Sequence, residues 1–282
     1  MAATINTNSM SLNAQRNLSS SQAGLSKAVQ RLSSGLRINS SADDAAGLAI
    51  ADRMNSQAKG FDVAIRNAND GISMAQTAES AMQAITDNLQ RMRELAVQAA
   101  NGTYTSGDRS SLDLEFQQLN QEIARVVGGT TFNGQSVLGS GVSFTFQVGA
   151  GTASTDSISV TSAQVGLSSA SFGSTTAGAL SGSGISASVG AAQSAIASID
   201  AAIDTLNTAR ANWGAVQNRF SSVVQTLQVA SENAKSSRGR IMDADFAQET
   251  ANMTRGQILQ QAGTAMVAQA NSMPNNVLSL LR

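Results

Sequence analysis

The sequence offers few side chains that could carry out catalytic or metal-binding chemistry. Its 282 residues include no histidine and no cysteine. Imidazole and thiolate groups serve many general-base, nucleophilic and metal sites, so those arrangements are excluded here. Carboxylates, lysines and hydroxyls remain, but they form no recognisable catalytic constellation. We therefore predict a protein that is not an enzyme and that holds no cofactor and no metal.

Two acidic pairs are the closest approach to a reactive site. Asp43 and Asp44 could be an acid–base couple, but Ser41 stands three residues before Asp44. That spacing is typical of a capping box at the start of a helix, with Ser41 as the N-cap. Asp243 and Asp245 resemble the first two ligands of a calcium loop, but the glycine and the distal glutamate are missing. Both pairs therefore favour structural roles.

The charge content is low for a soluble chain. Charged residues make up 13% of the sequence and the net charge is −1, whereas an ordinary soluble domain has about 25% charged residues. A surface rich in small neutral side chains favours close packing with other proteins, although biased composition alone is an alternative. Nothing indicates a nucleic-acid partner, and no apolar run is long enough for membrane insertion. The first residues lack the apolar core of a secretory signal, so we expect a cytoplasmic protein or one exported by another route.

The clearest element is a long helix over residues 191–235. Large apolar residues recur there at seven-residue spacing, which on an α-helix predicts packing against another long helix. The series is Ile199, Leu206, Trp213, Phe220, Leu227 and Ala234. A second apolar line is interrupted at Arg210, Gln217 and Ser231. Partners are available, because similar stripes predict a helix from Ser41 to about Asn101, irregular near Gly60 and Gly71, and another from Ser110 to Gly128.

Between these helices the periodicity changes to that of β-strands. Apolar residues alternate with polar ones from Val142 to Val148 and again at Ile158 and Val160, which predicts a β-hairpin. Residues 161–190 are mainly Ser, Gly, Ala and Thr. We therefore predict a mainly α fold: an elongated antiparallel helical bundle or coiled coil of N- and C-terminal helices, with a β-hairpin region and a small, mostly β or loop, outer insertion.

The two ends of the chain carry further amphipathic helices, set apart by a break at Arg238-Gly239-Arg240. Their seven-residue apolar stripes have no partner within either segment, so we predict that they pair with each other and then with neighbouring copies. The predicted assembly residues are Leu18, Leu25, Val29, Leu32, Leu36, Leu259, Met266, Met273, Val277 and Leu280. Self-association of this kind is a heterologous contact, which gives an open helical polymer unless its rotation closes. Pro274 kinks or ends the last helix.

This organisation predicts three domains. Residues 1–42 with 240–282 form a terminal coiled-coil domain. Residues 43–140 with 190–239 form a helical core domain, in which the hairpin region begins near residue 130. Residues 141–189 form an exposed insertion.

Several long motifs resemble those of the bacterial flagellin family. The N-terminal ones are SLNAQRNL (11–18), RLSSGLRINSSADDAAGLAI (31–50), RNANDGIS (66–73), LQRMRELAVQ (89–98) and FNGQSVL (132–138). The C-terminal ones are GAVQNRF (214–220), DADFAQET (243–250), TRGQILQQAGTAMVAQAN (254–271) and PNNVLSLLR (274–282). Together they span most of the chain outside the insertion.

The resemblance implies a secreted structural subunit of the extracellular flagellar filament, which serves swimming motility. In that family the terminal helices form the inner layer of the filament, and export is unfolded, through the flagellar type III apparatus. Implied partners are other copies of the chain, an export chaperone at 254–282, the filament cap and the hook-junction proteins.

A Toll-like receptor of an animal host is a further implied partner. By motif matching, its contacts here are Gln90, Arg91, Leu95, Glu115, Ile199 and Ile203. For Arg91 and Glu115, a solvated helix face or salt bridges between subunits is an equal alternative. A hook–filament junction protein and an adhesin that uses residues 140–190 remain as other interpretations of the whole chain.

Overall fold

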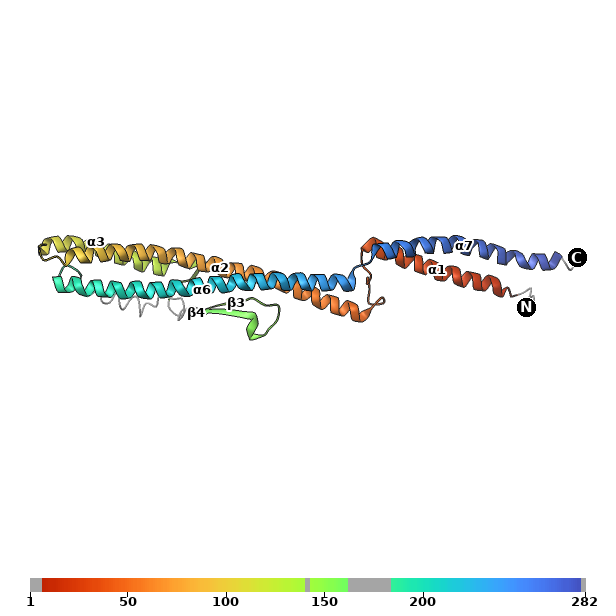
Figure 1. Cartoon of the computed structure of the whole chain (residues 1–282), viewed down its shortest axis with the longest axis horizontal. Helices are drawn as coiled ribbons and strands as arrows, with labels where there is room; N and C mark the ends of the chain where they lie inside the picture. The colour runs from red at the N-terminus through yellow and green to blue at the C-terminus, as the bar shows by residue number, and fades with distance from the viewer. Residues whose placement is uncertain (1–6, 140–142, 162–183, 280–282) are drawn as a thin grey trace. The chain divides into compact units, whose positions relative to one another are not determined.

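The computed structural model describes residues 7–139, 143–161 and 184–279. These residues form five α-helices: α1 (Ser9–Ser34), α2 (Ala45–Ala99), α3 (Ser106–Gly129), α6 (Val189–Met242) and α7 (Phe246–Ser279). Two small antiparallel sheets pair β1 (Thr131–Phe132) with β2 (Gln135–Ser136), and β3 (Ser143–Gln147) with β4 (Ser157–Thr161) (Figure 1). The predicted mainly α fold with a β-hairpin region is confirmed.

The chain divides into two compact units. Unit 1 comprises Met1–Ser56 and Asn233–Arg282, and unit 2 comprises Gln57–Glu232. The predicted division into three domains stays a prediction, and residues 141–142 and 162–183 of its insertion lie outside the described residues.

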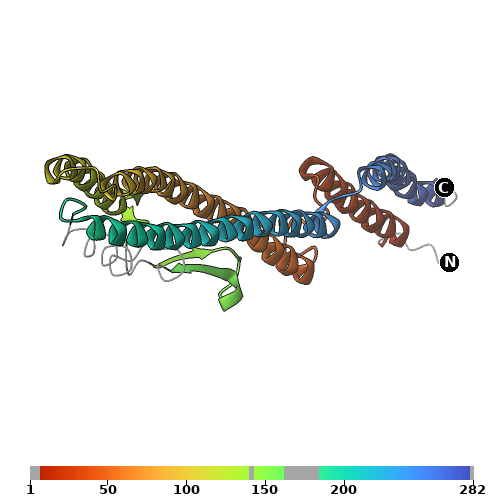
Figure 2. The same cartoon turned by 60° about the vertical axis from the view of Figure 1, so that its left-hand side comes forward.

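Unit 2 is built around α6, as the seven-residue spacing predicts. Ile199, Leu206, Trp213 and Phe220 are completely buried, and Leu227 is 7% exposed. The first four pack into one core with the apolar stripe of α2 and with α3, and Figure 2 shows α2 and α6 side by side. Fully burying a large apolar side chain contributes roughly 1.5–3 kcal/mol, so this seam is the main source of stability in unit 2.

The three polar residues that interrupt the second line of α6 all bind acidic side chains of α2. Gln217 Nε2 donates to Glu79 Oε2 at 3.1 Å, and Arg210 forms an ion pair with the same carboxylate at 3.9 Å. Buried Ser231 donates through its Oγ to Asp62 Oδ1 at 2.8 Å. A shift of one helix along the other would leave these groups without partners, so they fix the antiparallel register.

The predicted irregularity of α2 near Gly60 and Gly71 is wrong, because α2 is one continuous helix. These glycines instead permit close packing. A Cβ at Gly71 would stand 2.8 Å from the Phe220 ring, and one at Gly60 would stand 2.7 Å from the Cβ of Ala150. The missing side chains make room for neighbours, at the modest cost in helix propensity that glycine carries.

The β3–β4 hairpin is confirmed, with Phe144 opposite Val160 and Phe146 opposite Ile158. It lies against the helices of unit 2: the Phe146 ring meets the Phe220 ring edge-on at 5.2 Å, and Asn67 of α2 donates to the Gln147 carbonyl. The alternation of apolar and polar residues thus places one face of the hairpin on the core.

Two predicted helix starts are wrong by several residues. Helix α3 begins at Ser106, where Thr105 and Asp108 form a reciprocal capping box. In α2 the Asp44 carboxylate, rather than Ser41, accepts from the Gly47 N–H at 2.8 Å. In both places the sequence contains a Ser–x–x–Asp pattern, Ser41 to Asp44 and Ser110 to Asp113, that has the spacing of a capping box but does not form one. Spacing alone does not tell such a pattern from the residues that do cap the helix.

In unit 1 the segments that connect the helices meet in a short antiparallel bridge between Leu36 and Asp243. The Arg37 N–H donates to the Met242 carbonyl at 2.6 Å, and the Ala244 N–H donates to the Gly35 carbonyl at 2.9 Å. Ile38, Ala51 and Met242 form a small core beside this bridge. The bridge holds the end of α1 against the segment that leads into α7.

The predicted break at Arg238-Gly239-Arg240 is displaced. Helix α6 continues to Met242, and α7 then starts at Phe246 after Asp245, whose carboxylate accepts from the Ala247 N–H at 2.9 Å. Glycine alone does not end a helix whose neighbours pack well, whereas an N-capping aspartate starts a new one. Pro274 lies within α7 and does not end it.

Candidate interaction surfaces

The contact between α1 and α7 is made by small residues on α7. Gly256, Gly263 and Ala270 follow one another at seven-residue spacing, and Gly256 and Ala270 are buried. The buried Glu249, seven residues before Gly256, extends this line. A Cβ at Gly256 would stand 3.1 Å from Leu25 Cβ, and one at Gly263 would stand 2.9 Å from Leu18 Cδ1. The two antiparallel helices therefore approach closely, with leucines of α1 seated over glycines of α7.

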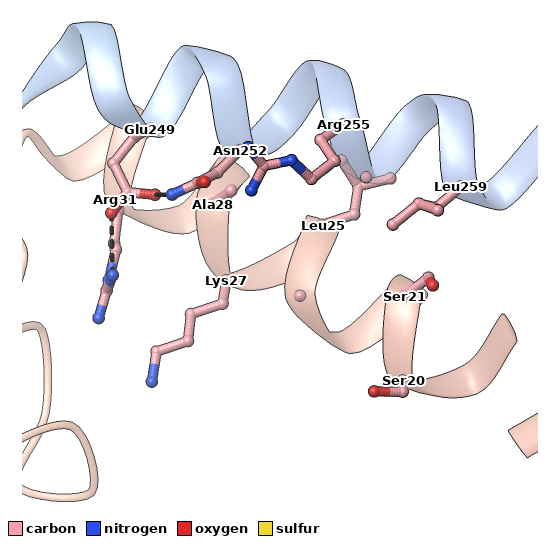
Figure 3. A pocket seen from close by; sticks show the side chains of 12 residues that line it. Ser20, Ser21, Leu25, Lys27, Ala28, Arg31, Glu249, Asn252, Arg255 and Leu259 are labelled. Atoms are coloured by element: carbon pink, nitrogen blue, oxygen red, sulfur yellow. Dashed lines mark hydrogen bonds and ion pairs between the residues drawn. The ribbon is translucent and has the colours of Figure 1, made fainter. Parts of the chain in front are cut away.

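Polar contacts tie both ends of this seam. Near the outer end, Ser11 Oγ donates to Asn271 Oδ1 at 2.7 Å. At the inner end, Arg31 Nη1 donates to the buried Glu249 carboxylate at 2.8 Å, and Asn252 also donates to it (Figure 3). Such charge-assisted hydrogen bonds are stronger than neutral ones, and they set the register of the pair.

A second ion pair joins α1 to the loop before α2. Lys27 Nζ lies 2.8 Å from Asp43 Oδ1. The Lys27 hydrogen bond, helped by the Asn39 N–H, lowers the pKa of the Asp43 carboxyl from 3.8 to about 2. Asp43 is therefore a structural anion, which accepts from the Asn39 and Ser40 N–H groups rather than from those of α2.

The predicted assembly residues separate into two groups. On α1, Leu18, Leu25 and Leu32 are half-buried, as is Leu36 in the bridge that follows the helix, whereas Val29 of α1 is 47% exposed. On α7, Leu259, Met266 and Met273 are 47%, 61% and 45% exposed. The side chain of Val277 and all of Leu280 lie outside the described residues.

This distribution has a physical cause. Helix α7 presents two seven-residue lines to its surroundings, and the line of small residues faces α1 because it permits the closer approach. The line of large apolar residues therefore faces away from α1. The apolar periodicity of the sequence predicts the large line. The small line, Gly256-Gly263-Ala270, has the same seven-residue spacing, which is the signal in the sequence that could have revealed it.

The exposed line of α7 borders an apolar groove. Met10 and Leu18 of α1 line one side, and Leu259, Ala262 and Met266 of α7 line the other. Ile258, which is 60% exposed, lines a second groove together with Leu259. Soluble monomers rarely expose a contiguous apolar surface of this kind unless it binds something.

The predicted receptor-contact residues lie on the other unit, where α2, α3 and α6 run together. Gln90, Arg91 and Glu115 are exposed, Ile203 is half-buried, and Leu95 and Ile199 are buried in the core at 1% and 0% exposure. In the free chain the side chains of Leu95 and Ile199 pack in the core beneath this face, and their role as receptor contacts stays a prediction. The sequence could not separate these two roles, because a motif match does not tell which side of a helix faces inward.

Arg91 is held by two carboxylates within the chain. It donates to Glu115 of α3 at 2.8 Å and to Glu94 of α2 at 2.9 Å. These hydrogen bonds, with Glu115 the stronger influence, raise the pKa of the guanidinium above its ordinary value. Arg91 and Glu115 thus form an exposed intramolecular pair, an arrangement that the sequence analysis did not consider.

Arg93 makes a similar contact with the other neighbouring helix. It donates to Asp200 of α6 at 2.7 Å, and this bond raises the pKa of Arg93. The two arginines, two residues apart on α2, therefore connect α2 to α3 and to α6.

No group of histidine, cysteine or acidic side chains that could hold a metal ion occurs in the described part of the chain. Among the helices described here, none has both the length and the apolar character needed to cross a membrane.

Comparison with known proteins agrees with this architecture. The N-terminal helical region of bacterial flagellin matches residues 5–142, and the C-terminal helical region matches residues 196–281. Flagellin of Halalkalibacterium halodurans is 44% identical over 278 residues, which cover 99% of each chain. Flagellin of Xenorhabdus nematophila is 44% identical over 313 aligned residues that cover both chains fully. The crystal structure of Bacillus cereus flagellin is 32% identical, covers 57% of this chain and 88% of that one, and has a TM-score of 0.49.

A helical bundle whose two ends pair with each other, and which has an exposed apolar line, is typical of a structural protein that packs against other chains. The chain belongs to the bacterial flagellin family. It is a subunit of the flagellar filament, which is an extracellular structure.

Proposed function

We propose that the chain self-assembles, through the exposed apolar faces of α1 and α7, into the helical filament that drives swimming. The observation that carries this proposal is the line Leu259-Met266-Met273, which α1 leaves uncovered. A second copy of the chain is the occupant we favour, because a seven-residue apolar line fits another long helix. A relative from Treponema phagedenis, 40% identical over 99% of both chains, is named a flagellar filament core protein.

Export in an unfolded state through the flagellar type III apparatus completes the proposal, and family membership supports it. Before assembly, the same α7 line would be a suitable surface for an export chaperone that binds 254–282. The filament cap and the hook-junction proteins would meet the chain at the two ends of the polymer.

Assembly can be tested with one pair of variants. We expect the unmodified full-length chain to extend sheared filament seeds, as measured by pelleting and negative-stain microscopy. Leu259→Glu places a charge on the exposed apolar line and should abolish extension, because burying an unpaired carboxylate is costly. Gln261→Glu adds the same charge two residues away, to an exposed polar site on another side of α7, and should extend seeds far better. Equal extension by both variants would show that this line is not an assembly surface.

We further propose that a host Toll-like receptor contacts the exposed face at Gln90, Arg91 and Glu115. The exposure of this charged pair supports the proposal, since exposed arginines are frequent at the centres of interfaces. Arg91→Ala should weaken signalling by receptor-expressing reporter cells, whereas Arg93→Ala removes a comparable arginine on a different side of α2. If the two variants signal equally, Arg91 is not a receptor contact.

A further inference from the structure

Six of the methionines fall into two contrasting groups, whereas Met54 and Met253 are intermediate in exposure and Met242 is buried in unit 1. Met74, Met82 and Met92 are at most 1% exposed in the core of unit 2. Met10, Met266 and Met273, in contrast, are 52%, 61% and 45% exposed, and all three lie on α1 or α7. A leucine would provide similar apolar area without a sulfur atom that can react, so the exposed group introduces a chemical sensitivity at one particular surface.

The three exposed methionines belong to the surface that we propose for assembly. Met10 and Met266 line the same groove, together with Leu18 and Leu259. Met273 lies seven residues after Met266, on the same line of α7. Met10 and Met266 therefore share one groove and Met273 lies further along the same line of α7, so a change in the polarity of these side chains acts on the proposed assembly surface.

We propose that Met10, Met266 and Met273 form a peroxide-sensitive modification site, whose oxidation to methionine sulfoxide blocks assembly of the free subunit. This inference rests on the proposed self-assembly through α1 and α7. It adds to it a chemical control at the same surface, with peroxides as the class of co-reactant.

The chemistry is a two-electron oxygen transfer. A lone pair of the thioether sulfur attacks one oxygen of hydrogen peroxide, the O–O bond breaks, and an S–O bond forms. The sulfur is oxidised to the sulfoxide, while the second oxygen leaves and takes up the protons as water. Exposure decides which methionines react, so the three on α1 and α7 are modified before those in the core of unit 2.

The sulfoxide changes the surface in a way that opposes assembly. It replaces a flexible apolar side chain with a polar one, which must lose its water when another helix covers it. Because every subunit of a polymer repeats the same contact, the penalty applies at each addition. Subunits already in the filament have these side chains covered, so they react more slowly than free ones.

The experiment uses the full-length chain, hydrogen peroxide and sheared filament seeds. Sites of oxidation are mapped by peptide mass spectrometry, and the critical concentration for seed extension is measured by pelleting. We expect sulfoxide first at Met10, Met266 and Met273, with a rise in critical concentration of roughly tenfold or more. Treatment with the two methionine sulfoxide reductases should restore extension.

Two variants sharpen the test. The triple variant Met10→Leu, Met266→Leu, Met273→Leu keeps apolar volume and should extend seeds equally well before and after peroxide. Met92→Leu changes a buried methionine and should stay as sensitive as the unmodified chain. The inference would be overturned if the oxidised chain extended seeds as well as the untreated chain. It would also be overturned if peroxide reduced seed extension by the triple variant as much as by the unmodified chain, or if full repair by the reductases failed to restore extension.

The same experiment separates this inference from the function on which it rests. If the untreated chain fails to extend seeds, the proposed self-assembly is wrong, and the inference falls with it. If the untreated chain extends seeds and the mapped sulfoxides make no difference, self-assembly stands and only the inference is wrong.

Discussion

The two units of this chain use the same seven-residue spacing in opposite ways. In unit 2 the large members of the repeat, such as Trp213 and Phe220, point inward and are completely buried. In unit 1 small residues such as Gly256 face the partner helix, and large ones such as Met266 face outward. Unit 2 is thus stabilised by its own side chains, whereas unit 1 leaves apolar area uncovered. An apolar repeat therefore indicates that a helix has a partner, but not whether that partner is in the same chain.

The largest expected effect contrasts the two classes of apolar residue. Trp213→Ala empties a completely buried site and should lower the free energy of unfolding of unit 2 by about 3–5 kcal/mol. Met266→Ala removes a mostly exposed side chain and should change the stability of the free chain by about 0.5 kcal/mol or less. Denaturant unfolding followed by circular dichroism measures both, and similar losses would contradict the contrast.

The buried ion pair of unit 1 should rank next. Arg31→Met removes the partner of the buried Glu249 carboxylate and should destabilise unit 1 by about 1–3 kcal/mol, because a buried charge loses its hydrogen bond. Lys27→Met breaks the more exposed pair with Asp43 and serves as the matched control, with a smaller expected effect. Thermal melts of the two variants, compared with the unmodified chain, decide the order.

The close approach of α1 and α7 predicts a comparable or smaller loss. Gly256→Val adds bulk where a Cβ already stands 3.1 Å from Leu25 Cβ, so we expect about 1–3 kcal/mol of destabilisation from overpacking. Gly24→Val makes the same change in α1 at a site with no neighbour within 4 Å, and should be neutral within about 0.5 kcal/mol. Equal stabilities of the two variants would mean that the small residues of α7 do not set the helix separation.

The smallest effect concerns pH and is confined to unit 1. The pKa of Asp43 falls from 3.8 to about 2 on folding, because the carboxylate is held by Lys27. Its contribution to stability is therefore fully present above pH 3.8 and is lost as the pH falls through about 2. Asp43→Asn should flatten this part of the stability profile. Identical profiles of the two chains between these pH values would exclude the linkage.

The sequence predicted the fold well where the periodicity was long and regular. The α6 seam through Trp213 and the β3–β4 hairpin were both correct, because burial enforces a period of 3.5 or 2 residues over many turns. The glycines were misread: Gly71 and Gly239 indicated irregularity or a break, yet both lie within helices. A glycine can be present because a neighbouring group packs too closely for a side chain, or because the backbone must bend. At Gly71 the neighbouring Phe220 ring shows that close packing is the reason.

The candidate surfaces were predicted less completely. The exposed line through Leu259 and Met266 was identified, but its orientation away from α1 depends on the competing line of small residues. Leu95 and Ile199 were assigned to a contact face and are buried in the free chain. Which residues of a motif are exposed depends on how three helices pack together, and spacing along one helix does not contain that information.

The hydrogen bond between Ser231 and Asp62 has a consequence for the order of folding. Pairing α1 with α7 in an unfolded chain would close a loop of about two hundred residues, and the entropic cost of closure rises with the logarithm of loop length. Once unit 2 has folded, Asp62 and Ser231 are 2.8 Å apart at its boundary. The two terminal segments then start from neighbouring points and meet at the high effective concentration of a short tether. The folding of unit 2 thus brings the two terminal segments together, and we expect α1 and α7 to pair only after unit 2 has folded.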